Sequence, residues 1–190
     1  ERIEWVGLSF VRKAKDVSLL KKIIKKRKIN HKVIAKIEKP EAIKNIDSII
    51  NVTDAVMVAR GDLGVEVPPQ KVPVYQKMIV GKCIKNAKPV VIATQMLESM
   101  TDSPTATRAE VNDVANSVID GADAVMLSGE TSIGKYPLKT VDTMRKIIRD
   151  IEGSEHNISK NKEEKTLLNS NRLLSNAICS NACTVAEQIK

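Results

Sequence analysis

Short runs of apolar residues, many of them β-branched, recur along the chain. The five runs are Trp5–Val11, Lys32–Ile37, Asp54–Ala59, Pro89–Thr94 and Asp123–Leu127. Each run is nearly continuous in apolar character instead of alternating with polar residues. This is typical of strands in a parallel sheet that is buried on both faces. The pattern therefore predicts five parallel β-strands.

Segments with the periodicity of amphipathic helices lie between and after these runs. They cover Val17–Lys28, Glu41–Ile50, Val72–Asn86, Arg108–Asp120 and Leu138–Ile151. In each segment apolar residues recur at spacings of three and four, which gathers them on one helix face. Thr107 and Glu110 have the spacing of a capping box, which marks the start of the fourth helix.

Strand and helix alternate five times, which predicts βαβ units and an α/β fold with a parallel sheet. A doubly wound sheet and a (β/α)8 barrel share this pattern, and periodicity alone does not separate them. In a barrel, five units are too few for closure, so about three strands would precede Glu1. In the barrel interpretation, residues 1–152 would form the later part, about five of eight units, of a (β/α)8 TIM barrel.

The alternation ends after residue 152. Residues 153–171 are rich in Ser, Asn, Lys and Glu and poor in apolar residues, which is typical of a linker. Residues 172–190 return to a helical pattern. We interpret them as the first helix of a further α/β domain at the C-terminal side.

The net charge of +8 raises the question of a nucleic-acid partner. The densest basic cluster, Lys21–Lys28, is interleaved with Ile residues, as on an amphipathic helix with a solvated basic face. Aromatic residues make up only 2% of the chain, so platforms for base stacking are scarce. We expect no nucleic-acid partner. The alternative, a basic nucleic-acid module, would require binding that collapses with salt.

Cysteine content and hydropathy indicate the compartment. Cys83, Cys179 and Cys183 are an odd and scattered set, which favours a reducing cytoplasm over a disulfide framework. Cys179 and Cys183 are one helical turn apart, but no histidine is near them, so a zinc site is not expected. The chain contains no run of about eighteen apolar residues, so no membrane span is predicted. The chain opens at Glu1 without a signal pattern, which suggests a start within a domain.

Polar and charged residues end all five apolar runs. The strand-end sequences are Ser9-Phe10-Val11-Arg12, Lys36-Ile37-Glu38, Arg60-Gly61-Asp62, Thr94-Gln95 and Ser128-Gly129-Glu130-Thr131. In barrels and in open parallel sheets, functional groups lie at the carboxyl ends of the strands. Lysine and arginine are unusual at the end of a buried strand that leads into an ordinary turn. We therefore expect a functional site at this edge of the sheet.

Lys36 and Glu38 lie two residues apart on one predicted strand. Because side chains alternate along a strand, both point to the same face. This spacing is compatible with a mutually neutralising ion pair and also with two charges that act on a ligand. The spacing alone leaves the two interpretations equally open.

Asp62 favours the interpretation that these charges act on a ligand, because it ends the next strand and is expected beside Glu38. Two neighbouring carboxylates repel each other unless a cation or a proton lies between them. Magnesium binds to one or two protein carboxylates together with substrate oxygens. Glu38, Asp62 and Lys36 therefore predict a magnesium site that takes an anionic substrate, in which the lysine meets the substrate's charge.

Weaker candidates lie at the neighbouring strand ends. Gly61 and Gly64 would let backbone N–H groups approach an anion, although a plain turn explains the glycines alone at least as well. Thr94 and Ser128 offer hydroxyl groups for proton transfer or hydrogen bonding. A single hydroxyl at such a position is more often a helix N-cap than a catalytic group.

Taken together, the motifs closely resemble those of the pyruvate kinase family over about residues 5–151. The matching stretches are residues 9–12 (SFVR), 35–38 (AKIE), 57–66 (MVARGDLGVE), 93–100 (ATQMLESM), 104–110 (PTATRAE) and 120–131 (DGADAVMLSGET). They occur in the family's order and approximate spacing. The combination is far more specific than any one motif.

The resemblance implies phosphoryl transfer from phosphoenolpyruvate to ADP, which gives pyruvate and ATP. Lys36 would stabilise the transferring phosphoryl group and the developing enolate. Glu38 and Asp62 would be the protein ligands of Mg²⁺ or Mn²⁺. The backbone of Gly61 and Asp62, with Thr94, would bind the carboxylate of phosphoenolpyruvate.

The resemblance also implies that Thr94 and Ser128 belong to a network of hydroxyl groups and water that protonates the enolate. The family's nucleotide-contacting arginine, its K⁺ ligands and its lid domain would precede this chain. Its regulatory site would follow Lys190. K⁺ is therefore expected as a cofactor whose ligands lie outside the chain, and the full-length protein is expected to be a cytoplasmic homotetramer. The chain alone is expected to be inactive.

Two further alternatives concern function. Another barrel enzyme that handles phosphoenolpyruvate or pyruvate, such as a metal-dependent aldolase, would also place two carboxylates at strand ends. It would not be expected to reproduce the segments at residues 93–100 and 128–131. A non-catalytic truncated fragment is the second alternative, and the presence of Lys36, Glu38, Asp62 and Thr94 favours an active parent instead.

Overall fold

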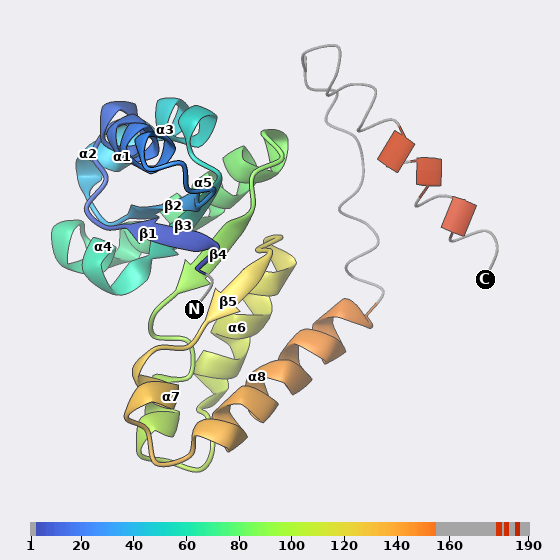
Figure 1. Ribbon diagram of the computed structural model, residues 1–190. Coiled ribbons are helices and arrows are strands. Elements are labelled where there is room, and N and C mark those ends of the chain that lie inside the picture. Colours follow the sequence, from blue (N-terminus) through green and yellow to red (C-terminus); the bar gives the residue numbers. More distant parts are fainter. Residues whose placement is uncertain (1–2, 155–177, 180, 183–184, 187–190) are drawn as a thin grey trace. The chain divides into compact units, whose positions relative to one another are not determined.

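A computed structural model describes residues 3–154 of the chain and, beyond them, residues 178–179, 181–182 and 185–186 (Figure 1). The chain divides into two compact units, Glu1–Ile158 and Ser159–Lys190. The first unit holds the five strands described below. The linker predicted over residues 153–171 lies outside the described residues except for Gly153 and Ser154. In the predicted helix at 172–190, the six described residues are helical, and the domain assignment there stays a prediction.

The first unit is built on one parallel sheet of five strands. They are β1 (Trp5–Leu8), β2 (Lys32–Ile37), β3 (Ala55–Ala59), β4 (Val90–Ala93) and β5 (Ala124–Met126). Each strand pairs with the next in sequence, in the order β1-β2-β3-β4-β5 (Figure 1). All five predicted strands are confirmed, and most are shorter than predicted. A doubly wound sheet reverses its strand order at a switch point, whereas an order without reversal is that of an arc of a (β/α)8 barrel.

The helices follow the strands. They are α1 (Ala14–Lys26), α2 (Pro40–Lys44), α3 (Ile46–Val52), α4 (Arg60–Glu66), α5 (Val72–Lys85), α6 (Arg108–Ile119), α7 (Gly129–Ser132) and α8 (Pro137–Glu152). Short 3₁₀ turns, η1 (Pro69–Lys71) and η2 (Glu98–Thr101), accompany them. The capping box at α6 is confirmed, because Thr107 N–H donates to Glu110 at 2.7 Å and Glu110 N–H donates back to the Thr107 hydroxyl.

The single helix predicted at 41–50 is wrong in one respect, because it consists of α2 and α3, which meet at Asn45. The Asn45 side chain donates to the carbonyl oxygens of Arg12 and Glu41, at 2.9 and 3.0 Å. Asparagine readily bonds to nearby backbone groups, and such bonds compete with a continuous helix. The sequence pattern also did not predict α4 and α7, two short helices that begin directly after β3 and just after β5.

The core lies on one face of the sheet. Val33, Ala35 and Ile37 of β2 are fully buried there, and they pack in one cluster with residues of α3 and α5. The alternate residue Lys36 lies on the opposite face. On that face Lys36 is half-buried in β2, whereas Ala59 of β3 and Ala93 of β4 are fully buried, so the expected burial on both faces holds for β3 and β4 more than for β2. The strand pairing places Met57 beside Lys36 on this second face.

Candidate functional site at the carboxyl ends of the strands

The strand register brings the predicted site residues to one edge of the sheet. Lys36 pairs with Met57 in the next strand, and Ala59 pairs with Ala93. The residues that follow β2, β3 and β4 therefore leave the sheet at about the same level. α4 begins at Arg60 without an intervening loop, which keeps its first turn close to the ends of β2 and β4.

Lys36 and Glu38 form the ion pair that their spacing left open. The Lys36 Nζ lies 2.7 Å from Glu38 Oε1, and it also donates to the Ser9 hydroxyl at 3.0 Å. Glu38 is 1% exposed, and its Oε2 accepts the Phe10 N–H at 2.6 Å. An ammonium has three N–H donors and a carboxylate accepts about four hydrogen bonds. Both groups thus keep capacity for a ligand after these contacts are counted.

The segment after β1 completes the surroundings of this pair. Phe10 has a φ of 55°, an uncommon backbone conformation that turns its N–H toward Glu38. The Phe10 side chain is exposed, and the Lys39 ammonium lies 5.5 Å from the centre of its ring. The sequence showed Ser9 and Phe10 only as part of a strand-end motif. Their contacts with Lys36 and Glu38 required the fold.

Gly61 and Thr94 are brought together directly. The Gly61 N–H donates to the Thr94 hydroxyl oxygen at 2.7 Å, and that hydroxyl donates to the Ala93 carbonyl at 2.5 Å. A Cβ atom at Gly61 would lie 3.3 Å from the Thr94 hydroxyl oxygen, closer than most such contacts. A side chain at position 61 would therefore require the Thr94 side chain to shift by a few tenths of an ångström.

Asp62 lies in the first turn of α4, and its side chain is exposed. Within the described part of the chain it forms no hydrogen bond or ion pair. Nor do any three His, Cys, Asp or Glu side chains of that part come close enough to hold a metal ion by themselves. Glu38 retains lone pairs although it is 1% exposed, and Asp62 is exposed. By ligand type the two suit magnesium, which takes one or two protein carboxylates together with several outside oxygens.

Ser128 is the N-cap residue of α7, but its hydroxyl makes no capping hydrogen bond to that helix. Its backbone N–H donates to Glu130 Oε2 at 2.7 Å. Glu130 is 3% exposed, and its other oxygen accepts the Leu97 N–H at 3.3 Å. Glu130 therefore ties the strand end at β5 to the segment after β4. No sequence pattern had indicated this role.

Glu110 holds the η2 turn against the start of α6. It accepts the Ser99 N–H at 2.7 Å and the Ser99 hydroxyl at 2.5 Å, in addition to the Thr107 contacts. Burial by itself would raise the pKa of this carboxyl. The donors from Ser99 and Thr107 together outweigh burial and lower the pKa below its usual value of 4.5. The segment after Thr94 is thereby anchored at its far end.

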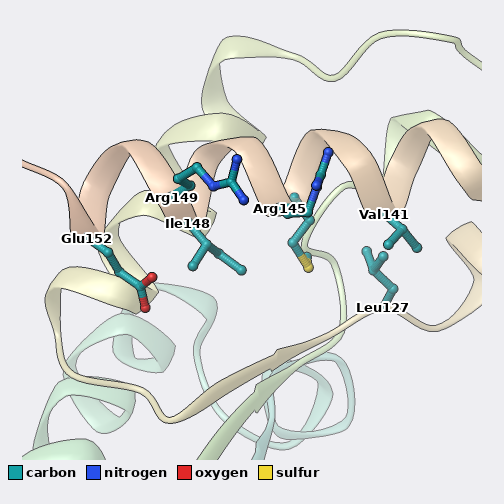
Figure 2. A pocket seen from close by; sticks show the side chains of 7 residues that line it. Leu127, Val141, Arg145, Ile148, Arg149 and Glu152 are labelled. Carbon is teal, nitrogen blue, oxygen red and sulfur yellow. The ribbon is translucent and has the colours of Figure 1, made fainter.

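An apolar groove of about 460 Å³ lies elsewhere in the unit, along α8. Figure 2 shows Val141 beside Leu127 in this groove, with Arg145, Ile148 and Arg149 further along the helix and Glu152 at its end. None of the site residues predicted from the sequence lines it.

None of the helices in the described part of the chain combines the length and the apolar content that a membrane span requires.

Fold and site together define a parallel α/β protein of the barrel type, with a lysine, two acidic residues and hydroxyl groups at the carboxyl ends of its strands. The family model described as "Pyruvate kinase, barrel domain" matches residues 1–141. The chain therefore belongs to the pyruvate kinase family, as its motifs suggested.

Curated relatives agree with this membership. The chain is 55% identical over 150 residues to "Pyruvate kinase" from Mycobacterium tuberculosis, which covers 79% of the chain and 32% of that protein. It is 46% identical over 191 residues to "Pyruvate kinase" from Clostridium acetobutylicum, covering 100% of the chain and 40% of that protein. For "Pyruvate kinase" from Staphylococcus aureus the identity is 51% over 155 residues, covering 82% and 26%. The chain thus spans well under half the length of these relatives.

Proposed function

We propose that this chain provides the phosphoenolpyruvate and divalent-cation half of a pyruvate kinase active site. The reaction would transfer the phosphoryl group of phosphoenolpyruvate to ADP. The observation that supports it most is the grouping of the Lys36–Glu38 pair and the Gly61–Thr94 contact at one sheet edge, in a chain of this family. Phosphoryl transfer depends on positioning and charge neutralisation more than on covalent catalysis, and these residues offer both.

Lys36 would neutralise the charge that develops during transfer. Its side chain is 26% exposed, so the ammonium can reach a ligand while Glu38 and Ser9 hold it in place. The bond between phosphorus and the enol oxygen of phosphoenolpyruvate breaks as a new bond forms to a terminal oxygen of ADP. The enolate left behind carries negative charge on its oxygen, and a fixed ammonium close to it lowers the barrier.

Glu38 and Asp62 would hold Mg²⁺ or Mn²⁺. When bound, the cation supplies positive charge to the oxygens of the substrate and fixes their orientation. Glu38 suits this role because the Phe10 N–H and Lys36 orient its carboxylate. The ligands of the expected K⁺ would lie outside this chain.

The backbone N–H groups of Gly61 and Asp62, with Thr94, would bind the substrate carboxylate. Because the Gly61 N–H donates to the Thr94 hydroxyl, the carboxylate would replace that hydroxyl as its acceptor while the hydroxyl stays beside it. Thr94 and Ser128 would take part in delivering a proton to the carbon of the enolate, which yields pyruvate. Ser128 fits because its hydroxyl makes no capping bond to α7. In the intact enzyme, which we propose to be a cytoplasmic homotetramer, the ADP-binding groups would come from outside these 190 residues.

The test begins with the full reading frame that contains this sequence. We expect the purified protein to form pyruvate and ATP from phosphoenolpyruvate and ADP in the presence of Mg²⁺. Lys36→Met and Glu38→Gln are each expected to abolish most of the turnover, whereas Lys22→Met, on the exposed face of α1, should not. Near-normal turnover in both site variants would show that the assignment is wrong.

A chimera tests whether this chain can supply its half of the active site when another enzyme supplies the rest of the barrel. This chain would replace the matching region of the Clostridium acetobutylicum enzyme, a relative whose similarity covers 100% of the chain. We expect the 190-residue chain alone to be inactive and the chimera to be active. A folded chimera that binds ADP but forms no pyruvate would contradict the proposal that this chain supplies the phosphoenolpyruvate half.

A further inference from the structure

Arg60 is a buried arginine directly after β3, and the roles above do not use its side chain. It is 9% exposed. Its Nη2 donates to the carbonyl oxygen of Thr94 at 2.7 Å and to that of Gln95 at 3.3 Å. We propose that Arg60 is a positioning residue, which fixes the backbone of Thr94 so that the Thr94 hydroxyl stays against Gly61. This inference rests on the proposed function, because Thr94 is given its role there.

The backbone that Arg60 holds is an unfavourable one. Thr94 and Gln95 have φ values of 72° and 56°. Positive φ is uncommon for residues other than glycine, and most of all for β-branched residues such as threonine. Such a conformation persists only where the surroundings hold it in place. The two carbonyl groups that receive N–H donors from Arg60 belong to these two residues.

The position of the Thr94 hydroxyl depends on that backbone. With this φ, the hydroxyl accepts the Gly61 N–H at 2.7 Å, and Gly61 is the residue next to Arg60. Arg60 therefore contacts the carbonyl of Thr94 while its neighbour contacts the side chain of Thr94. If Thr94 relaxed to an extended conformation, the hydroxyl would leave the N–H of Gly61 and the proposed carboxylate site would lose its shape.

A second set of contacts holds Arg60 itself. Its Nη1 lies 2.7 Å from Asp113 Oδ1 on α6 and 3.5 Å from the Gln76 side-chain oxygen on α5. Its Nε has no hydrogen-bond partner within the described part of the chain. The protein therefore tolerates one unsatisfied buried donor in an orientation that aims the other two nitrogens at the loop and at Asp113.

Lysine would not replace Arg60. A guanidinium presents several N–H donors in one rigid plane, so it can bind a carboxylate on one side and two carbonyl groups on the other. A lysine ammonium could keep the Asp113 pair, but it cannot reach all three acceptors in this geometry. The charge would be retained and the loop would be released. This difference makes Arg60→Lys the informative substitution.

Steady-state kinetics of the full-reading-frame protein test the proposal, with Arg60→Lys and Asp113→Asn compared with Ile50→Val. Ile50 is fully buried in α3, so its variant controls for lost stability alone. We expect Arg60→Lys to lower kcat/KM for phosphoenolpyruvate by about 10²-fold, as small displacements of positioned groups do. The KM for ADP should change much less. Asp113→Asn should act in the same direction with a smaller effect.

Amide hydrogen exchange gives a readout that does not require catalysis. Gly61 N–H should exchange faster in Arg60→Lys than in wild type, while Ile50→Val should not change Gly61 selectively. A wild-type protein without phosphoryl transfer would refute the proposed function, and the exchange at Gly61 would still test Arg60. Unchanged kinetics for phosphoenolpyruvate, equal losses for both substrates, or unchanged exchange at Gly61 would each overturn the positioning role.

Discussion

The aspartates at the two ends of the sheet differ in their contacts. At the amino ends, Asp54 precedes β3 and Asp123 precedes β5. Each accepts a backbone N–H near the start of the neighbouring strand, Asp54 from Val33 and Asp123 from Val90, both at 2.8 Å. Asp54 also pairs with Lys21 at 2.7 Å. These carboxylates are bound to groups of the fold itself, and they fix the strands side by side.

At the carboxyl ends the charged groups retain capacity for other partners. Asp62 has no hydrogen bond or ion pair in the described residues, and the Lys36–Glu38 pair is open to solvent on the lysine side. Residue type alone therefore does not separate the aspartates bound within the fold from Asp62, which we propose to be a metal ligand. The end of the strand is the better guide, because in parallel α/β folds the helix N-termini and loops that bind ligands follow the carboxyl ends.

The sharpest contrast between the two ends is expected from their lysines. Lys36→Met should lower kcat of the full-reading-frame protein by about 10²- to 10³-fold, the usual cost of removing a preorganised electrostatic group. Lys21→Met removes the partner of Asp54 at the other end and should leave kcat within about twofold while lowering stability slightly. Turnover assays at saturating substrate make the comparison. Equal effects would mean that the carboxyl end has no special role.

A second contrast concerns the metal. Asp62→Asn should raise the Mg²⁺ concentration needed for half-maximal activity by roughly tenfold or more, since a carboxylate ligand is lost. Asp54→Asn makes the same chemical change at the amino end and should leave the Mg²⁺ requirement unaltered. A Mg²⁺ titration of activity for both variants decides. The assignment of Asp62 as a ligand fails if the two titrations coincide.

For the free energy of unfolding we expect the opposite, a larger effect at Asp54 than at Asp62. Asp54→Asn is expected to lower the free energy of unfolding by about 1–3 kcal/mol, because a charged acceptor of two hydrogen bonds is lost. Asp62→Asn, with an exposed side chain, should change it by less than about 0.5 kcal/mol. Urea denaturation at pH 7 measures both. A larger loss for Asp62 would argue that it, too, is bound within the fold.

The stabilisation by Asp54 should also depend on pH. Burial alone would raise the pKa of Asp54, but the Lys21 hydrogen bond and the Val33 N–H outweigh it and lower the pKa below its usual value of 3.8. The ionised form is thus favoured in the folded state, so the stabilisation is complete above that value and is lost as the pH falls through the lower folded pKa. The difference between wild type and Asp54→Asn should therefore shrink in acid.

At the capping box of α6 we expect a modest effect on stability and none on catalysis. Thr107→Ala removes the hydroxyl that accepts the Glu110 N–H, at a cost of about 1 kcal/mol. It leaves the carboxylate of Glu110 on Ser99, so the turn that follows Thr94 should stay anchored. Unfolding measurements should register the loss, while kinetics for phosphoenolpyruvate should not. A change in those kinetics would extend the site to the start of α6.

Much of this fold could be predicted from local sequence. The β-branched runs predicted all five strands, and the helical periodicity predicted α1, α5, α6 and α8 to within a few residues, because burial on one face leaves a period in the sequence. The split at Asn45 was missed, since it depends on a hydrogen bond to Arg12, 33 residues away. Strand order was also undecided until the pairing showed no reversal.

The site divides in the same way. That Lys36 and Glu38 share a face followed from the alternation of strand residues. Whether they form an ion pair could not be predicted, because the pair depends on how Ser9 and Phe10 pack around the two side chains. Arg60 could not be recognised as more than part of a motif, since its partners on β4's following loop and on α6 are distant in sequence.

The sequence by itself determined the five strands, the longer helices, the family resemblance and the identity of the charged residues at the carboxyl ends, because each of these is encoded by local spacing and residue type. Only the tertiary structure decided which charges are paired, that the Gly61 N–H meets the Thr94 hydroxyl, and that Arg60 holds the backbone of that threonine. Those facts depend on distances of a few ångströms between residues far apart in the chain. Such distances are set by strand register and helix packing, and no short segment of the sequence contains them.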